Sequence, residues 1–540
     1  MKTIDAKALR GWIEDGQELA ILDAREEGEF GASHLFWAIP CPLSRAEIRA
    51  PALLGRRATR VVCVDDGSGP PGQSLAERLA TYLESIGCTE ISVLAGGTKS
   101  WEAAGFVLFS GVNVPSKAFG EWVEHHYGTE SVDAPELKQW IDERRDMVVL
   151  DSRTAEEFAR MTIPTAISVP GGELAYRIGD LVPSPDTLIV VNCAGRTRSI
   201  MGAESLRRAG IPNRVVALRN GTMGWELAGL SCDLGRDDKF TPDLPRTAAE
   251  ALSRASQFAD QSGVRVISAD ELAGFEADPG RTLYVLDVRD PAEFRAGHRP
   301  GSRNAPGGQL VQATDTWIGV RGARIVLLCD TGVRARMSAA WLRQMGHRDV
   351  FVVEGGLDAV RGSGRAAAEA AQDPVSAIDV STIDVATIDV AGLTALLAAE
   401  GLVVVDLGRS VDYRDGHVPG ALWGIRTRLS ALSARLTAAT QVVVTSPDAK
   451  LAGLAVAELR GLTGGEIRVL EGGTAAWKAA GGKLEKDRAV PADGDCVDFY
   501  LRPYDRNSGV EAAMQEYLSW EIDLVHEIVR DGTVRFGVGH

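Results

Sequence analysis

Two short patterns recur along the chain, and they constrain its fold more than any other feature of the sequence. The first is an apolar run that ends in Asp, continues two residues later with Arg, and then reaches an acid followed by an aromatic residue. Its first copy is Leu22-Asp23-Ala24-Arg25, and further copies stand at Asp151, at Asp287 and, with Gly408 in place of the Arg, at Asp406. Self-similarity at a fixed period predicts tandem structural units.

The second pattern closes each unit with two turn residues after an apolar run and a Trp four or five residues later. The copies end at Trp101, Trp225 and Trp477, whereas the third copy has Val360 where the Trp would stand. Paired glycines after a strand indicate a turn with positive φ, and we expect each Trp to be a core side chain on the following helix. The spacing gives four units of about one hundred residues, an ordinary domain size.

Within each unit, apolar β-branched runs alternate with amphipathic segments, which predicts a parallel sheet with helices on both faces. We expect the recurring Asp and Arg to bond across a domain. A helix is predicted over 246–261, and a low-complexity spacer over 362–392, where Ile378-Asp379-Val380 is repeated twice more. Ser508–Glu511 is typical of a capping box, and the helix after it is predicted to dock on a neighbouring domain, with a homodimer contact as the alternative. Its apolar positions are Val510, Met514, Tyr517, Leu524 and Ile528.

The composition excludes several classes of protein. A net charge of −16 argues against a general nucleic-acid or anionic-membrane partner. Seven cysteines without any CxxC pair argue against a disulfide framework or a structural zinc site. No apolar run could cross a bilayer, and the N-terminus has no leader-like apolar stretch. We therefore expect a soluble, reduced, cytoplasmic protein, in which an anionic substrate would need its own positive pocket.

The loops between the central strand and the next helix decide the function. In the second unit the loop runs from Cys193 to Arg198, and in the third it runs from Cys329 to Arg334. Both have Cys at the first position and Arg at the sixth, and both lead into helices that end at a glycine, Gly210 and Gly346. The first unit has Asp65-Asp66 and the fourth has Ser446-Pro447 in this region, so neither loop carries a thiol.

A thiol at a helix N-terminus beside arginines is expected to have a lowered pKa and to be largely thiolate near neutral pH. Successive loop amides would form an anion-binding nest, and Arg196, Arg198 and Arg334 would hold the oxygens of an anionic substrate. The other cysteines, namely Cys41, Cys63, Cys88, Cys232 and Cys496, are interpreted as small buried side chains, and His34 and His298 as structural hydrogen-bonding groups.

With these motifs the chain resembles the rhodanese family, the thiosulfate sulfurtransferases, and in particular proteins with four tandem rhodanese domains. The resemblance implies an α/β fold of four rhodanese-like domains at 1–110, 125–232, 262–365 and 380–486, each a five-stranded parallel sheet flanked by helices, followed by a helical tail at 487–540. It implies sulfur transfer from thiosulfate to cyanide or a thiol through a cysteine persulfide, without a metal or organic cofactor.

Carried over by position, the resemblance makes Cys193 and Cys329 the sulfur carriers in the second and third domains, and the first and fourth domains inactive. The residues expected to bind the substrate are Gly195, Arg196, Arg198, Gly332 and Arg334. The expected partners are small sulfur-containing anions and thiol acceptors.

Two other functions stay open. A phosphatase on the same fold would need a loop one residue longer, with Arg six places after Cys, but Ser199 and Ala335 stand there. This alternative is therefore disfavoured. The other is a persulfide relay or scaffold whose donor is not thiosulfate, which the two loops without a thiol favour modestly.

Overall fold

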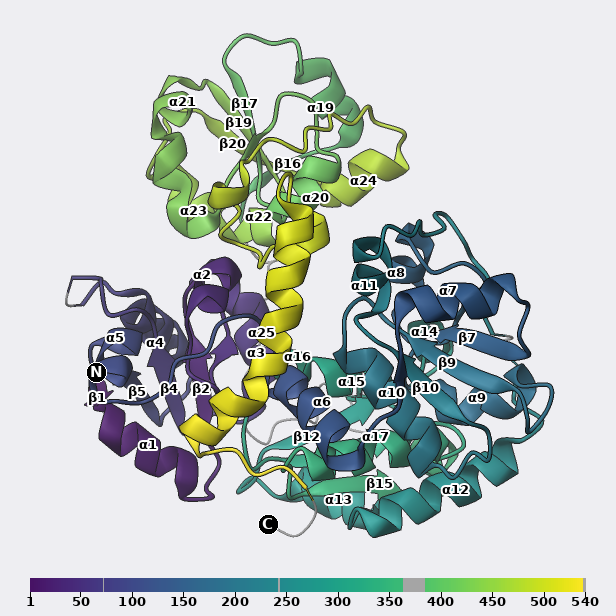
Figure 1. Ribbon diagram of the computed structural model, residues 1–540. Helices are drawn as coiled ribbons and strands as arrows, with labels where there is room; N and C mark the ends of the chain where they lie inside the picture. The colour runs from purple at the N-terminus through teal and green to yellow at the C-terminus, as the bar shows by residue number, and fades with distance from the viewer. Residues whose placement is uncertain (71, 241–242, 363–383, 538–540) are drawn as a thin grey trace.

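The structure is a computed structural model that describes residues 1–70, 72–240, 243–362 and 384–537 (Figure 1). It contains four five-stranded sheets, and in each the strands follow one order, which in the first unit is β1-β5-β4-β2-β3. All named strand pairs are parallel. The predicted α/β fold of four parallel-sheet units is confirmed.

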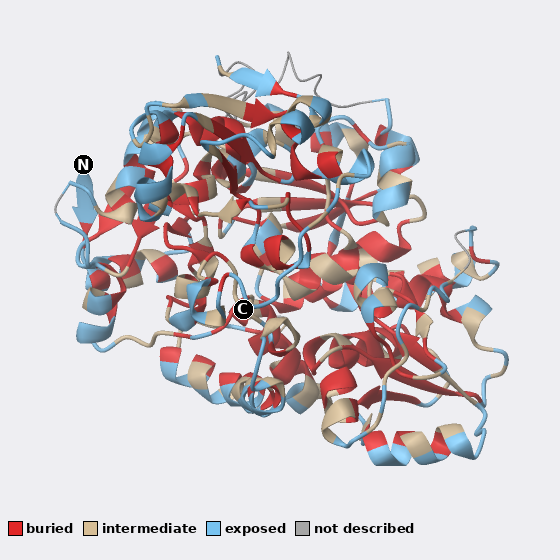
Figure 2. Ribbon diagram, turned by 90° about the horizontal axis from the view of Figure 1, so that it is seen from above, coloured by how far each residue is buried: buried red, intermediate tan, exposed pale blue. Residues whose placement is uncertain are grey.

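The strands are short and lie between layers of helices. In sheet order they are β1 (Lys2–Ile4), β5 (Ile91–Leu94), β4 (Val61–Val64), β2 (Ala20–Asp23) and β3 (Ile39–Pro40); β6 (Ser131–Val132), β10 (Val215–Leu218), β9 (Leu188–Asn192), β7 (Met147–Asp151) and β8 (Ile167–Ser168); β11 (Arg265–Ile267), β15 (Val350–Val353), β14 (Arg324–Leu328), β12 (Leu283–Asp287) and β13 (Arg303–Asn304); and β16 (Ala386–Ile388), β20 (Glu466–Leu470), β19 (Gln441–Thr445), β17 (Leu402–Asp406) and β18 (Leu422–Trp423). The central strands are buried (Figure 2), as expected where helices cover both faces of a parallel sheet.

The helices of the units are α1 (Ala6–Glu14), α2 (Glu27–Ala32), α3 (Ala46–Leu54), α4 (Leu75–Ser85) and α5 (Gly97–Ala103); α7 (Ala134–Asp142), α8 (Ala155–Arg160), α9 (Leu174–Leu181), α10 (Thr197–Arg208) and α11 (Gly221–Leu227); α13 (Ala269–Ala277), α14 (Pro291–Ala296), α15 (Gly307–Gln312), α16 (Thr314–Trp317), α17 (Val333–Gln344) and α18 (Gly356–Val360); and α19 (Val390–Leu396), α20 (Ser410–Asp415), α21 (Ser433–Ala438), α22 (Lys450–Leu454), α23 (Val456–Arg460) and α24 (Gly473–Ala479). None of the described helices is both long and apolar enough to cross a bilayer.

Three further helices connect or cover the units: α6 (Val114–Tyr127), α12 (Ala248–Gln261) and α25 (Val510–Asp531). The helix predicted at 246–261 is confirmed as α12, which packs along α17. The predicted docking of the tail helix is also confirmed, because α25 packs against α6 in the middle of the molecule (Figure 1). The predicted capping box is wrong, since α25 begins after Gly509 at φ 66° without any side-chain cap.

The recurring motif residues have structural roles. Trp101, Trp225 and Trp477 are buried in the cores of their units, as predicted. The Asp and Arg of the first pattern were expected to bond across a domain, and Asp151 does so by accepting from the Asn192 side chain at 3.0 Å. Both also bond locally, since Arg153 pairs with Asp151 at 2.7 Å and donates to the Met161 carbonyl. This pairing fixes the turn after the strand, and Asp23 and Asp287 pair with their own Arg in the same way.

The predicted spacer at 362–392 is corrected at its end. Residues 363–383, which include Ile378-Asp379-Val380, lie outside the described residues. Ile388 ends strand β16, and Asp389 caps α19 by accepting a hydrogen bond from the Gly392 amide at 2.7 Å. The last copy of the repeat therefore belongs to the fourth sheet, where Asp389 occupies the place that Asp5 has in the first unit.

Candidate active site

In all four units, the loop between the central strand and the next helix begins at an equivalent position. The register of each sheet aligns the last residue of the central strand with the motif Asp, for example Asp151 with Asn192. The next residue is the first of the loop, and its carbonyl accepts a hydrogen bond from the second residue of the closing helix in each unit. The four aligned residues are Asp65, Cys193, Cys329 and Ser446.

In the first and fourth units, oxygen atoms occupy the place of the sulfur. The carboxylate of Asp65 accepts hydrogen bonds from the amides of Gly67 and Ala76, at 2.8 and 2.9 Å. The hydroxyl of Ser446 accepts from the Ala452 amide at 3.2 Å. The anion nest of the first loop is therefore filled by its own carboxylate, and neither loop offers a thiol.

The thiol of Cys193 is buried, with 2% of the residue exposed. Its Sγ lies 3.4 Å from the hydroxyl of Ser199, and that hydroxyl donates its proton to the Arg196 carbonyl at 2.8 Å. The cysteine must therefore be the donor of the S–H···O contact. Gly221 packs against the back of this loop so closely that an added Cβ would lie 2.2 Å from the Cys193 carbonyl oxygen, and its φ is 54°.

The prediction of a lowered thiol pKa is wrong for both cysteines. Burial raises the pKa of Cys193 above its ordinary value, although Arg198 and the Ser199 hydroxyl oppose the shift. Burial raises the pKa of Cys329 to about 11, against the opposing charge of Arg334. Desolvation of the thiolate outweighs the helix N-terminus and the arginines because both arginines already neutralise carboxylates.

The two arginines of the second loop have different surroundings. Arg198 forms a two-point ion pair with Glu157, at 2.6 and 2.8 Å. Arg196 forms a two-point pair with Glu121 on α6, at 2.8 Å for each bond, and also pairs with Glu124. Arg196 thus fastens α6 to the loop, which argues against its predicted role in binding the substrate.

A cavity of about 100 Å³ lies against the Cys193 loop at Ala194 and Arg198. It contains five cationic side chains and two carboxylates, so it is a positive pocket in an acidic protein. The cations are Lys117, Arg153, Arg160, Arg198 and Arg502, and the carboxylates are Glu157 and Asp505. Because α6 and the tail supply part of this lining, the pocket is completed by segments outside the second sheet.

Lys117 is the cation that the sequence analysis missed. It lies on α6, is 6% exposed, and its Nζ lies 4.6 and 4.5 Å from the ring centres of Tyr517 and Trp520 on α25. In the described part of the chain it has no ion pair with a carboxylate. Burial lowers its pKa to about 8, although Glu521 opposes the shift. The sequence signal that could have indicated this cation is the set of aromatic residues in the tail, which predicted that the tail helix docks on the rest of the protein.

The C-terminal helix covers the cysteine loop directly. Glu521 on α25 accepts hydrogen bonds from Thr197 at 3.3 Å and from Tyr517 at 3.0 Å. A Cβ added to Gly195 would lie 3.2 Å from the second carboxylate oxygen of Glu521, so Gly195 allows the helix to approach. The position of Gly195 is explained by this packing as well as by its place in the loop.

In the third loop, backbone amides surround the sulfur of Cys329, but carboxylates surround the arginine of the loop. The amides of Gly332 and Ala335 donate to Cys329 Sγ at 3.1 and 3.4 Å, which is the predicted anion nest. Arg334 is fully buried and pairs with Glu293, with Asp330, and with Glu173 of the second unit at 2.7 Å. Its charge is therefore fully engaged by carboxylates.

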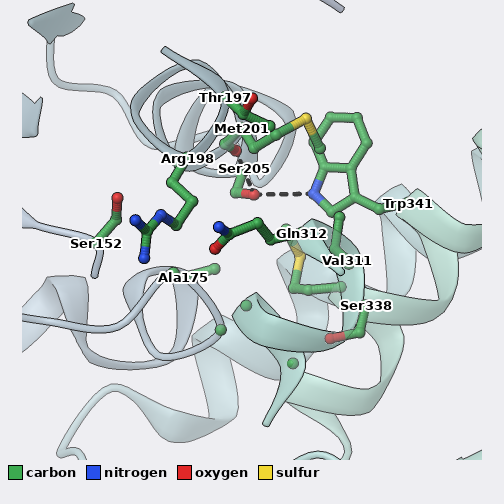
Figure 3. A pocket seen from close by; sticks show the side chains of 16 residues that line it. Ser152, Ala175, Thr197, Arg198, Met201, Ser205, Val311, Gln312, Ser338 and Trp341 are labelled. Atoms are coloured by element: carbon green, nitrogen blue, oxygen red, sulfur yellow. Dashed lines mark hydrogen bonds between the residues drawn. The ribbon is translucent and has the colours of Figure 1, made fainter. Parts of the chain in front are cut away.

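The second and third units face one another around a small cavity of about 40 Å³ (Figure 3). Arg198 of the second loop and Gln312 of the third unit point into it, and Trp341 donates to Ser205 across the interface at 2.9 Å. The glycine pairs Gly171-Gly172 and Gly307-Gly308 meet beside it. The residue after the first pair is Glu173 and the residue after the second is Gln309. Among the residues that the structure describes, only the third loop receives a carboxylate from the opposite unit.

A family model, the Rhodanese-like domain, matches residues 5–104, 133–228, 268–363 and 389–480. The chain belongs to the rhodanese-like family. The crystal structure of a thiosulfate sulfurtransferase from Pseudomonas aeruginosa is 42% identical and superposes with a TM-score of 0.88, covering 100% of both chains. The tandem arrangement of four rhodanese domains is thus shared over the full length.

Shorter relatives match single rhodanese units. Thiosulfate sulfurtransferase GlpE of Pseudomonas aeruginosa is 34% identical over 77 residues, which are 14% of this chain and 66% of that protein. A sulfurtransferase of Allochromatium vinosum is 29% identical over 99 residues, covering 18% and 90%. The chain matches only 32% of the tRNA uridine(34) hydroxylase of Erwinia tasmaniensis, at 28% identity over 116 residues, 21% of this chain. The sulfurtransferases among these relatives support a sulfur-transfer role for this chain.

Proposed function

We propose that this protein is a thiosulfate sulfurtransferase in which Cys193 carries the sulfane sulfur. The observation that carries the proposal is the cationic cavity against the Cys193 loop, into which Arg198 and Lys117 extend. Thiosulfate is a small dianion, and guanidinium and ammonium groups in a partly desolvated cavity bind anionic oxygens strongly. Two thiosulfate sulfurtransferases of the same family, described above, supply the choice of thiosulfate.

In the first half-reaction, the Cys193 thiolate attacks the outer sulfur of thiosulfate. A sulfur–sulfur bond forms to the protein, and the original sulfur–sulfur bond breaks with its electron pair leaving on sulfite. Arg198 and Lys117 stabilise the sulfonate oxygens as charge moves onto the leaving group. Once Cys193 is a thiolate, the Ser199 hydroxyl turns its proton from the Arg196 carbonyl to the sulfur, and the Ser199 amide at the start of α10 also stabilises the anionic sulfur.

In the second half-reaction, cyanide or a thiolate attacks the outer sulfur of the persulfide. The persulfide bond breaks, its electron pair returns to Cys193 as thiolate, and thiocyanate or a new persulfide leaves. Donor and acceptor use one cavity in turn, which gives ping-pong kinetics. Neither half-reaction requires a metal or organic cofactor.

Cys329 is proposed as a secondary carrier. Its sulfur lies in a nest of amides, but its arginine is held by three carboxylates and burial raises the pKa of its thiol to about 11. We therefore expect thiosulfate to load Cys193 faster than Cys329. The alternative function is a persulfide relay with a donor other than thiosulfate, and the experiment described next distinguishes the two.

The test is intact-mass analysis of the protein after incubation with thiosulfate, followed by peptide mapping. Wild type is expected to gain one sulfur atom on the Cys193 peptide first, C329S to gain it at an unchanged rate, and C193S to lose most of the gain and of the thiocyanate formation. C232S is the matched control, since Cys232 is the only free thiol among the described residues that is not buried. Sulfur uptake in the C193S/C329S double variant would refute the proposal, and uptake from a persulfide donor but not from thiosulfate would establish the relay.

A further inference from the structure

A second and larger cavity is lined by no residue of either cysteine loop. Its volume is about 460 Å³, and it is formed where the end of α1, the end of α17 and the segment after α25 meet. The lining residues that carry charge or can titrate are Glu14, Arg321, Arg343, His347, Arg348 and Arg535. It shares no residue with the cavity at Cys193.

Four arginines line this cavity, and none of them is paired with a carboxylate among the residues that the structure describes. Arg321 donates to the Ile13 carbonyl at 2.9 Å, and Arg535 donates to the carbonyls of Gly532 and Val534 at 3.0 Å. Arg343 likewise donates only to backbone carbonyls. Neutral carbonyls leave the positive charge uncompensated, in contrast to the ion-paired arginines of the cysteine loops.

Arg348 has no hydrogen-bond acceptor at all in the described part of the chain, and its side chain approaches Gly16 of the first unit across the cavity. Burial, together with the like charge of Arg348, lowers the pKa of Arg321 to about 10, against the opposing charge of Asp531. Arg321 also lies over the Trp37 ring, 3.9 Å from its centre. All four guanidinium groups thus remain charged at neutral pH.

The nearest carboxylates are already used. Glu14, the one carboxylate that lines the cavity, accepts from Arg10 at 2.8 Å. Asp531 pairs with the same arginine at 3.6 Å and accepts from the Thr533 amide. His347 adds no charge, because burial and Arg321 lower its pKa to about 4. In a protein of net charge −16, this concentration of free cations is a local exception.

From these observations we infer that the cavity binds a small molecule bearing a diphosphate or a longer phosphate chain. Guanidinium groups bind phosphate oxygens in two-point fashion, and the volume lies within the range of small-molecule sites. Several negative charges on adjacent groups match four arginines, three from the third unit and one from the tail, and the first unit lines the rest of the cavity. Occupancy would join the first unit, the third unit and the tail, so the ligand stabilises their mutual packing.

The experiment uses the full chain and inorganic pyrophosphate, monitored by calorimetric titration and thermal unfolding at constant ionic strength. We expect saturable binding at one site and a raised Tm. The variant R348Q/R535Q is expected to weaken binding at least about tenfold, since it removes two charge-assisted contacts. The control R145Q/R435Q removes the same charge from exposed positions outside the cavity and is expected to bind as wild type does.

Equal binding by both double variants, or no binding by wild type, would overturn the inference. Retained binding by K117M separates this site from the cavity at Cys193. Titration with adenosine diphosphate tests whether the ligand is a nucleotide or a bare phosphate chain. Tighter binding than that of pyrophosphate indicates a nucleotide beside Trp37, and equal binding indicates that the site recognises the phosphate chain alone. Thiosulfate turnover of R348Q/R535Q stays normal, so this test does not depend on the proposed function.

Discussion

Replacing Lys117 by Met is expected to change the shape of the pH profile for thiosulfate, in addition to the rate. The reactive form of the free enzyme needs a Cys193 thiolate and a Lys117 ammonium. Burial lowers the pKa of Lys117 to about 8 and raises the pKa of Cys193 above its ordinary value, which is about 8.5 for a free cysteine. The two groups therefore ionise in the reverse of the order that the reaction needs.

This reversal fixes the expected profile of kcat/KM. Because the Cys193 thiol ionises at a higher pH than the one at which Lys117 loses its proton, only a minor fraction of the enzyme is in the reactive form at any pH. In wild type, kcat/KM rises about tenfold per pH unit below about pH 8, passes a maximum, and falls about tenfold per unit at high pH as Lys117 loses its proton. K117M lacks the falling limb, because only the thiol still titrates.

The size of the effect at neutral pH follows from one lost charged contact. Such a contact contributes about 1.5–3 kcal/mol, so K117M is expected to raise KM for thiosulfate about 10- to 150-fold at about pH 7. Above about pH 8, the deficit shrinks about tenfold per unit, since the wild-type ammonium disappears as well. Thiocyanate formation measured by initial rates between about pH 6 and 10 gives both parameters.

K99M is the matched control, because Lys99 is exposed and pairs with Asp66 in the first unit. It is expected to reproduce the wild-type profile. If K117M lowers kcat/KM by the same factor at every pH, or keeps the falling limb, then Lys117 does not hold the substrate and only supports the packing of α6 against α25. The assignment of the cationic cavity as the thiosulfate site would then be refuted.

Three further predictions follow from the ion pairs and hydrogen bonds of the two loops. E173Q removes one of three carboxylates from Arg334, so alkylation of Cys329 by iodoacetamide is expected to accelerate several-fold. The Cys193 peptide of the same digest is the internal control. An unchanged alkylation rate of Cys329 would contradict the conclusion that the carboxylates around Arg334 suppress the reactivity of this thiol. S199A removes the hydroxyl 3.4 Å from Cys193 Sγ and is expected to lower kcat/KM about 2- to 12-fold, whereas A335S at the matching position of the third loop leaves thiosulfate turnover unchanged. E157Q breaks the ion pair with Arg198. Burial alone would raise the pKa of Glu157, but Arg198 outweighs it and holds this pKa well below its usual range. The carboxylate therefore stabilises the fold above its unfolded pKa, and this contribution is lost as the pH falls. The variant is expected to lose about 1–3 kcal/mol in urea unfolding at neutral pH and to approach wild type below about pH 4; a constant difference across this range would refute the linkage.

The fold could be predicted from the sequence because its signals are local and repeated. In each unit one strand ends at the motif Asp, the closing turn has a residue with positive φ, and the closing helix buries an apolar side chain at the Trp position. Even the unit without a Trp keeps this contact, since Val360 is buried in its core. Because the pattern occurs four times, equivalent positions of the units can be compared with one another. The strand register, for example, shows that Ser446 of the fourth unit stands at the position of Cys193 in the second.

The candidate site was only partly predictable, because half of its lining comes from outside the repeat. Position within the loop identified Cys193 and Arg198, but Lys117 and Arg502 belong to a connecting helix and the tail, whose docking has no local signature. The same gap explains the wrong thiol pKa. Arginines near a cysteine suggest a thiolate only if they are free, and the sequence did not reveal that Glu157 and Glu121 neutralise them.

The difference between the two cysteine loops follows from one residue at a near-symmetric interface. The second and third units present matching glycine pairs to each other, and Glu173 follows the first pair and Gln309 the second. The Glu173 carboxylate reaches Arg334 of the third unit. Glu173 carries a charge and completes the burial of Arg334, whereas the matching Gln309 has no charge with which to hold Arg198. Arg198 consequently keeps only Glu157 and remains in the wall of an open, cationic cavity, while Arg334 is fully buried among three carboxylates. Two loops of equal length and similar sequence thus acquire unequal access to an anion, because the partner that each unit provides to the other differs in charge.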